Sequence, residues 1–211
     1  MKQLTMLVLV SISLMGVEFN TAVEDYNKGS YIKALDAFYA LAKEGNVKAQ
    51  YNVGMIYENG KGLKPNRKEA MYWYEKAAKK ENAEAQYNLA QLYYESGIEN
   101  LHDYEKAKYW YEKAVKNGVK QAYNNLAALY LDGKGVKQDE KKAFELFQKA
   151  ANMDDASAQF NVALLYAWGK TITHDKMKAY ENLKKALNSG KSDASAYLDK
   201  LCDESAWVCK D

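Results

Sequence analysis

The chain is organised as an internal repeat with a period of about 36 residues. Residues 49–84 read AQYNVGMIYENGKGLKPNRKEAMYWYEKAAKKENAE, and later parts of the chain repeat this pattern with substitutions. A fixed period of this length is typical of arrays in which each unit is one supersecondary element that buries its apolar face against its neighbours. The complete copies span 49–84, 85–121, 122–157 and 158–193, and a half copy begins at Ala194.

Each copy contains two amphipathic helices separated by a loop. Alanine, aliphatic and aromatic residues recur at helical spacing in both halves of a copy, which indicates one buried stripe per helix. In the first copy these residues are Ala49, Val53, Ile56 and Tyr57, then Ala70, Tyr74 and Ala77. The loop holds GKG at 60–62, where glycine can take the positive φ that a helix end commonly needs. With a single proline in 211 residues, the chain is predicted to be all-α.

The two ends of the array are predicted to differ from the central copies. Residues 23–48 match the unit with a shorter loop, and they form the first unit of a single solenoid domain that spans 23–211. Residues 194–211 are expected to form a terminal cap helix, because a solenoid has to cover its last apolar face.

The amino terminus has the pattern of a secretory signal peptide. Lys2 precedes about fourteen uncharged, mostly apolar residues at 4–17. This run is too short for a membrane helix, which needs roughly 18 to 20 apolar residues. A basic start followed by such a run predicts export, with residues 1–22 removed and no membrane span left afterwards. Ala22 is the favoured last residue of the signal, and Gly16 is the alternative.

The cysteines of the chain, Cys202 and Cys209, are predicted to form a disulfide. Oxidising compartments preserve such bonds, and export would place the protein in one. A continuous helix would separate the two residues by roughly 10 Å of axial rise, beyond the reach of a disulfide. We therefore expect the last helix to end near Cys202 and the chain to turn back. No metal site is predicted, because His102 and His174 lie in different copies and match no zinc spacing.

Composition and motifs give no support for nucleic-acid binding or catalysis. Lys and Arg number 30 against 28 Asp and Glu, and no long run of like charges occurs, so no nucleic-acid partner is expected. Ser30 and Lys33 spell S-x-x-K, but the other motifs of serine β-lactamases do not accompany it, and a helix start is the simpler interpretation. The glycines at 54–62 lack the spacing of a phosphate-binding loop. We expect no catalytic residue and no cofactor.

Asparagine recurs on the first helix of every complete copy, just before a core aliphatic residue. It is unfavourable inside a helix, because its side chain competes for backbone hydrogen bonds. Four amides in register would form a ladder able to donate and accept hydrogen bonds along an extended peptide. The alternative is that each asparagine bridges adjacent helices and serves the fold. The predicted partner-binding residues are Asn52, Asn88, Asn125 and Asn161, with Gln50, Gln86, Gln159, Met55 and Gln91 beside them.

The pattern AQYN(V/L)(G/A)xxY, then GKG(L/V), then KAxxWYEKAA resembles the Sel-one-like repeat (SLR) family, a relative of tetratricopeptide repeats. The resemblance covers the chain from about residue 23 to the end. It implies antiparallel helix pairs stacked into a right-handed superhelical solenoid with a concave inner face. Bacterial members are often exported and usually act as protein–protein adaptors, and related tetratricopeptide domains hold peptides with first-helix asparagines.

The residues and the resemblance together favour an exported, non-enzymatic interaction module that binds a protein or an extended peptide on its concave face. We expect a monomer, located in the periplasm or secreted. One version of this role is an immunity protein that binds a toxin, as some exported family members do. The alternative from a different class is a β-lactam-binding protein or β-lactamase, as in the cysteine-rich branch of the family. That branch carries a disulfide in every repeat, whereas this chain has two cysteines in total.

Overall fold

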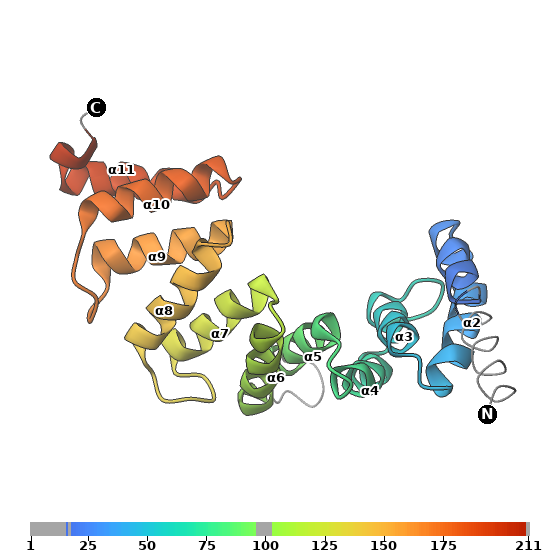
Figure 1. Ribbon diagram of the computed structural model, residues 1–211. Helices are drawn as coiled ribbons and strands as arrows, with labels where there is room; N and C mark the ends of the chain where they lie inside the picture. The colour runs from blue at the N-terminus through green and yellow to red at the C-terminus, as the bar shows by residue number, and fades with distance from the viewer. Residues whose placement is uncertain (1–15, 17, 96–102, 210–211) are drawn as a thin grey trace, which may run out of the picture. The chain divides into compact units, whose positions relative to one another are not determined.

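The structure is a computed structural model that describes residues 16, 18–95 and 103–209. Within these ranges the chain forms helices and no strand, which confirms the all-α prediction (Figure 1). The chain divides into two compact units, Met1–His102 and Asp103–Asp211. The predicted signal peptide lies largely outside the described residues, so its presence stays a prediction.

Consecutive helices of the first unit pack against one another in chain order. Residues 18–27 are helical, and Ala22 within them joins a buried cluster with Ala34 and Phe38. The numbered helices of this unit are α2 (Tyr31–Lys43), α3 (Val47–Asn59), α4 (Arg67–Ala78) and α5 (Ala83–Tyr94). Helix α3 packs against both α2 and α4, and α4 packs against α5. The two apolar stripes of the first copy therefore fold into a helix pair, as predicted.

The second unit continues the same pattern and ends in a short cap. Its helices are α6 (Tyr104–Lys116), α7 (Lys120–Asp132), α8 (Glu140–Ala151), α9 (Ala156–Trp168), α10 (Lys176–Asn188), α11 (Ala194–Glu204) and the 3₁₀ helix η1 (Ala206–Cys209). Helix α7 packs on α8 and α9 packs on α10, so each copy of the repeat again supplies one helix pair (Figure 1).

An asparagine or aspartate caps the amino end of most of the described helices. Asn46 Oδ1 accepts a hydrogen bond from the Ala49 amide at 3.0 Å, and Asp139 Oδ1 accepts one from the Lys142 amide at 2.9 Å. The same arrangement occurs at Asn66, Asn82, Asp103, Asp155 and Asp175. Each cap satisfies an amide that has no partner inside its helix. The caps define where the helices begin and which side chains face the core.

Small residues on the first helix of a pair let the second helix approach closely. Gly54 on α3 lies against the ring of Tyr74 on α4, and a Cβ added at Gly54 would come within 2.6 Å of Tyr74 Cδ1. Tyr74 and its counterpart Tyr111 on α6 are almost completely buried, so these repeated tyrosines belong to the core, as predicted.

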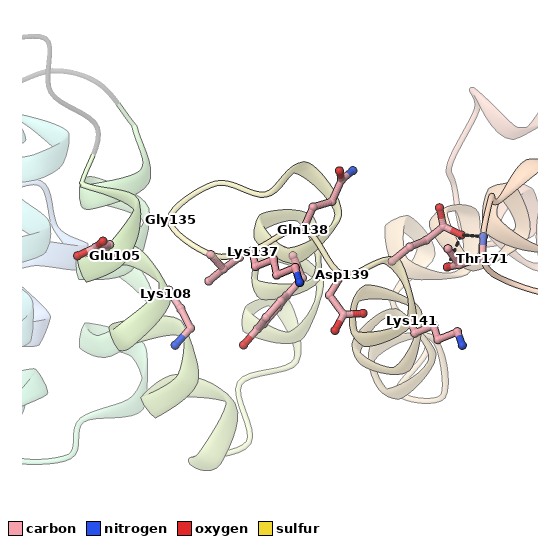
Figure 2. Close-up of a pocket in the computed structure, with 11 residues that line it drawn as sticks. Glu105, Lys108, Gly135, Lys137, Gln138, Asp139, Lys141 and Thr171 are labelled. Atoms are coloured by element: carbon pink, nitrogen blue, oxygen red, sulfur yellow. Dashed lines mark hydrogen bonds between the residues drawn. The ribbon is translucent and has the colours of Figure 1, made fainter.

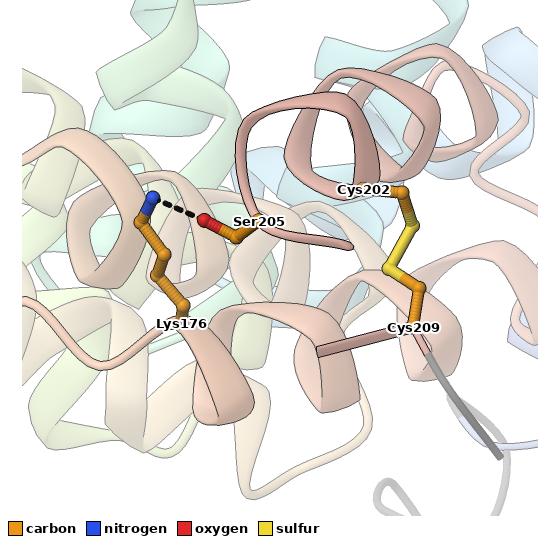
Figure 3. The surroundings of a disulfide bond; sticks show 4 residues. All are labelled: Lys176, Cys202, Ser205 and Cys209. Atoms are coloured by element: carbon orange, nitrogen blue, oxygen red, sulfur yellow. Dashed lines mark hydrogen bonds between the residues drawn. A yellow bond between two sulfur atoms is a disulfide. The ribbon is translucent and has the colours of Figure 1, made fainter. Parts of the chain in front are cut away.

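The carboxyl-terminal cap is closed by a disulfide between Cys202 and Cys209 (Figure 3). Helix α11 ends two residues after Cys202, the chain turns through Ser205, and η1 brings the two cysteine Cα atoms to 5.7 Å. The predicted helix end and the turn back are thus confirmed. Lys176 at the start of α10 donates a hydrogen bond to the Ser205 hydroxyl at the turn, which ties the cap to the preceding helix pair.

Candidate partner-binding face

The repeated asparagines lie on the first helix of each complete pair and are half-buried. Asn52 is on α3 and Asn88 on α5 in the first unit, and Asn125 is on α7 and Asn161 on α9 in the second. Met55, Gln91 and Leu164 lie one turn further along α3, α5 and α9 and are also half-buried. We call these positions the first-helix face of each unit. It comprises Asn52, Met55, Asn88 and Gln91 in the first unit, and Asn125, Asn161 and Leu164 in the second.

In the first unit, a chain of hydrogen bonds orients Asn88. Tyr74 Oη donates to Glu58 Oε2 at 2.6 Å, and Asn88 Nδ2 donates to Tyr74 Oη at 3.2 Å. Because the phenol gives its only proton to the carboxylate, its oxygen can act toward Asn88 only as an acceptor. The amide nitrogen of Asn88 therefore faces Tyr74. Burial raises the pKa of Tyr74 well above its ordinary value, and the hydrogen bond to Glu58 raises it further.

In the second unit, the two repeated asparagines differ from each other in their hydrogen-bond partners. Asn125 Nδ2 donates to Tyr111 Oη at 3.2 Å, which repeats the Asn88 arrangement. The next second helix carries Phe147 at the corresponding place, and phenylalanine has no hydroxyl to accept a bond. Asn161 Nδ2 donates instead to Asn124 Oδ1 at 3.1 Å. Asn88, Asn125 and Asn161 therefore bridge adjacent helices, and all four asparagines are half-buried.

The glutamines expected beside the asparagines are buried, and this corrects their assignment to a binding surface. Gln50 and Gln86 donate Nε2 to the carbonyl oxygens of Ala42 and Ala78 at 3.0 and 3.1 Å. Gln159 occupies the same position and is only 4% exposed. A glutamine here binds the end of the preceding helix, where carbonyl groups lack partners within the helix. These side chains are buried in the fold and offer a partner almost no surface.

Tyr51, Glu58, Glu84 and Asn124 lie beside the asparagines and were missed by sequence reasoning. Tyr51 is half-buried on α3, and its ring centroid lies 5.7 Å from that of Tyr74. A signal for it exists, because an aromatic residue precedes the asparagine in three copies, as Tyr51, Tyr87 and Phe160. Periodicity alone assigns such residues to the core, and only the packing shows that they border the exposed face.

A second feature lies at the loop ends of the helices in the second unit. An open pocket of about 800 Å³ is lined mainly by charged residues of α6, α8 and the loop that joins α7 to α8 (Figure 2). At its edge, Glu140 accepts hydrogen bonds from the Thr171 amide at 2.6 Å, the Thr171 hydroxyl at 2.9 Å and the Lys170 amide at 3.1 Å. Burial acts to raise the pKa of Glu140, but these donors hold it below its ordinary value. The carboxylate thus holds the loop of the following repeat.

Arg67 plays a related part at the start of α4. It donates to the backbone oxygens of Leu92 and Glu95 at 2.5 and 2.8 Å, and its guanidinium also pairs with the Glu95 carboxylate at 3.3 Å. The first residue of a second helix therefore binds the end of the next first helix in the first unit, at Arg67, and the loop after it in the second, at Glu140. These contacts stabilise the join between neighbouring repeats.

The S-x-x-K residues lie at the start of α2. Ser30 is the exposed residue before the helix, and its side chain makes no capping hydrogen bond. Lys33 is paired with the Asp25 carboxylate at 3.1 Å. The described part of the chain also contains no group of three or more histidine, cysteine or acidic side chains placed to hold a metal ion.

Comparison with known proteins identifies the repeat. A model of the Sel1 repeat family matches residues 47–82, 83–119, 120–155 and 156–191, which make up more than half of the chain. Each match begins two residues before the corresponding copy delimited from the sequence. No curated protein matches the chain.

Solved structures of Sel1 repeat proteins share the fold. A Sel1 repeat protein from Oxalobacter formigenes is 30% identical, with a TM-score of 0.74 over 84% of this chain and 70% of that one. The antigen c5321 of uropathogenic Escherichia coli, which has an SLR fold, is 24% identical, with a TM-score of 0.51 over 92% of this chain and 50% of that one. Immunity protein PA5088 from Pseudomonas aeruginosa is 19% identical, with a TM-score of 0.52 over 83% and 68% of the two chains. The last two likenesses show the fold alone. With its four matched repeats, this chain belongs to the Sel1 repeat family.

Proposed function

We propose that this protein is an exported, non-enzymatic interaction module that binds an extended segment of a protein partner on its first-helix faces. Sel1 repeat proteins typically serve as non-enzymatic scaffolds that bind other proteins. The observation that carries the proposal is the half-buried asparagine that recurs on α3, α5, α7 and α9. An amide can both donate and accept, which matches the alternating groups of an extended backbone.

The orientation of Asn88 supports this role. Its amide nitrogen faces Tyr74, so its carbonyl oxygen is the atom left to accept a hydrogen bond from a partner. An oriented acceptor loses little conformational freedom on binding, which favours affinity. Met55 and Gln91 add half-buried contact area one turn further along the helices.

The cap disulfide supports export, because such bonds persist in oxidising compartments and are rare in the cytosol. We place the protein in the periplasm or outside the cell. Across the residues that the structure describes, every helix is too short or too polar to span a bilayer. One version of this function is that of an immunity protein whose partner is a toxin, and the fold is shared with such a protein.

Affinity capture from a native envelope extract, followed by mass spectrometry, tests the proposal. The bait is the full mature chain, and the decisive variant is Asn52→Ala with Gln91→Ala. Asn188→Ala is the matched control, because Asn188 is an exposed amide at the end of the second helix α10. We expect the double variant to lose the captured protein and the control to retain it.

A folding control accompanies the capture. Both variants should unfold within a few degrees of the wild type, because Asn52 and Gln91 are partly exposed and substitutions of such residues usually change stability by about 0.5 kcal/mol or less. Full retention of the partner by the folded double variant would show that the first-helix face of the first unit does not bind it.

A further inference from the structure

Two carboxylates, Glu58 on α3 and Glu84 on α5, act on Tyr51 beside the first-helix face of the first unit. Glu58 lies two turns after Tyr51 on α3 and is held by the Tyr74 hydroxyl at 2.6 Å. Glu84 lies one turn before Asn88 on α5, so the two side chains share one side of that helix. Tyr51 packs against Tyr74, the residue that holds both Glu58 and Asn88, with a ring-centroid separation of 5.7 Å.

The charges of both carboxylates act on the Tyr51 phenol. Burial raises the pKa of Tyr51 and the hydrogen bond from Asn88 opposes it, while the charges of Glu84 and Glu58 raise the pKa further. Within the described ranges, neither carboxylate forms an ion pair. Glu75 on the second helix α4 provides the contrast, because Lys79 pairs with it at 2.7 Å.

The site therefore combines a half-buried aromatic ring, two carboxylates that form no ion pair within the described ranges, and the oriented carbonyl oxygen of Asn88. A cation lying against an aromatic ring is attracted by the negative potential of the ring face. A guanidinium group can in addition donate to carboxylate and amide oxygens at the same time, whereas an ammonium group acts as a compact point charge. Every group of the site favours a positively charged donor.

We propose that the partner segment places an arginine, or less favourably a lysine, against Tyr51, with its charged group between Glu58 and Glu84 and within reach of Asn88. This inference rests on the proposed function, because it names the chemistry of the segment that occupies the same face. It predicts that the partner segment carries a basic residue where it contacts Tyr51. The net charge of the chain is +2, so the net charge of the protein does not attract a basic partner, and the attraction has to come from the local carboxylates.

An acetylated oligo-arginine peptide is the first probe, and an oligo-glutamate peptide of equal length is its control. Binding to the full mature chain is measured by fluorescence anisotropy at low and at moderate salt. We expect the arginine peptide alone to bind, and Glu84→Gln to weaken its affinity by about threefold to tenfold. Glu84 is exposed, so this variant should fold normally. Glu181→Gln, an exposed carboxylate of the second helix α10, should change nothing.

Two results would overturn the inference. One is the absence of binding by the arginine peptide at low salt, and the other is equal affinity of the wild type, Glu84→Gln and Glu181→Gln. The captured natural partner separates this inference from the proposed function. If the partner is lost with Asn52→Ala and Gln91→Ala but retained by Glu84→Lys, the result supports the binding face and contradicts the cation site. If the partner is retained by all these variants, the result contradicts both the binding face of the first unit and the cation site.

Discussion

Gly135 lies directly against the backbone of Tyr104. A Cβ at Gly135 would come within 2.6 Å of the Tyr104 carbonyl carbon and 2.8 Å of the Glu105 amide nitrogen, and the φ angle of Gly135 is +65°. Glycine is required here for two reasons. Residues that carry a side chain rarely adopt this φ angle, and the contact with Tyr104 leaves no space for a Cβ atom. The second glycine of the GKG loop is therefore a contact between neighbouring repeats, in addition to its role near a helix end.

We predict that Gly135→Ala lowers the free energy of unfolding by about 2 to 4 kcal/mol, through backbone strain and the displaced Tyr104 backbone. Gly118→Ala is the matched control in the same unit, because Gly118 has a φ of +83° but nothing within 4 Å of an added Cβ. It should lose only about 1 to 2 kcal/mol. Urea unfolding measures both, and equal losses would contradict the contact with Tyr104.

The hydroxyl of Tyr74 is predicted to stabilise the first unit through both of its hydrogen bonds. Tyr74→Phe would leave Glu58 and Asn88 without this partner, and we expect a loss of about 1 to 3 kcal/mol at neutral pH. Tyr72→Phe is the control on the same helix, because the Tyr72 side chain is about half exposed and its ring contact with Lys76 would survive. Urea unfolding compares the two, and similar small losses would show that the buried phenol contributes little.

Stability should also fall in alkali because of Tyr74. An unfolded-state phenol releases its proton near pH 10, whereas the pKa of Tyr74 in the folded protein is raised. Below pH 10 both states keep the proton, so the full contribution is present. As the pH rises further, the unfolded state binds fewer protons than the folded state, and the free energy of unfolding decreases. We expect a shallower decrease in Tyr74→Phe between about pH 9 and pH 11, and identical slopes would count against the raised pKa.

The cap disulfide is predicted to stabilise the carboxyl-terminal end of the second unit. Replacing Cys202 and Cys209 by serine should lower stability by about 2 kcal/mol, because the bond closes a short loop. Trp207 in η1 is largely exposed and lies between the cysteines, so its fluorescence reports loosening of the cap. Alkylation of the folded protein, followed by mass spectrometry of the intact chain, should find no free thiol. Two alkylated cysteines in protein purified without reductant would disprove the bond.

We predict that export, if it occurs through the amino-terminal signal, removes residues up to Gly16 rather than up to Ala22. Ala22 is fully buried, and the ring of Phe19 lies 5.5 Å from that of Phe38 in the first core cluster. A chain that starts at residue 23 lacks both side chains and should be about 2 to 5 kcal/mol less stable than one that starts at residue 17. Mass spectrometry of the exported protein gives the mature terminus, and a start at residue 23 would contradict the prediction.

Features that depend on local spacing could be predicted from the sequence. Helix pairs follow from the spacing of residues such as Ala49 and Val53, and the turn after Cys202 follows from the limited reach of a disulfide. Gln50 and Gln86 could not be placed, because a polar residue inside a helix is expected to be exposed. Their burial depends on carbonyl groups at the end of the preceding helix, eight residues earlier.

The candidate site shows the same division between local and distant information. The register of Asn88 is visible in the repeat, but its orientation depends on Tyr74 and Glu58, which belong to another helix pair. The role of Glu140 depends on Thr171, 31 residues away, and no motif connects them. Contacts between neighbouring copies are therefore the part that a single sequence does not reveal.

The hydrogen bonds of Glu140 with Thr171 also bear on the order of the repeats. Where the second helix begins with tyrosine, as at Tyr31 and Tyr104, the following loop offers glycine at the contact, Gly62 and Gly135. Where it begins with Glu140, the loop offers Thr171, a residue with two donors. Exchanging these loops would set a side chain against the tyrosine backbone or leave a carboxylate without donors. Each of these repeats therefore requires the loop of its own successor, and the repeats are not interchangeable.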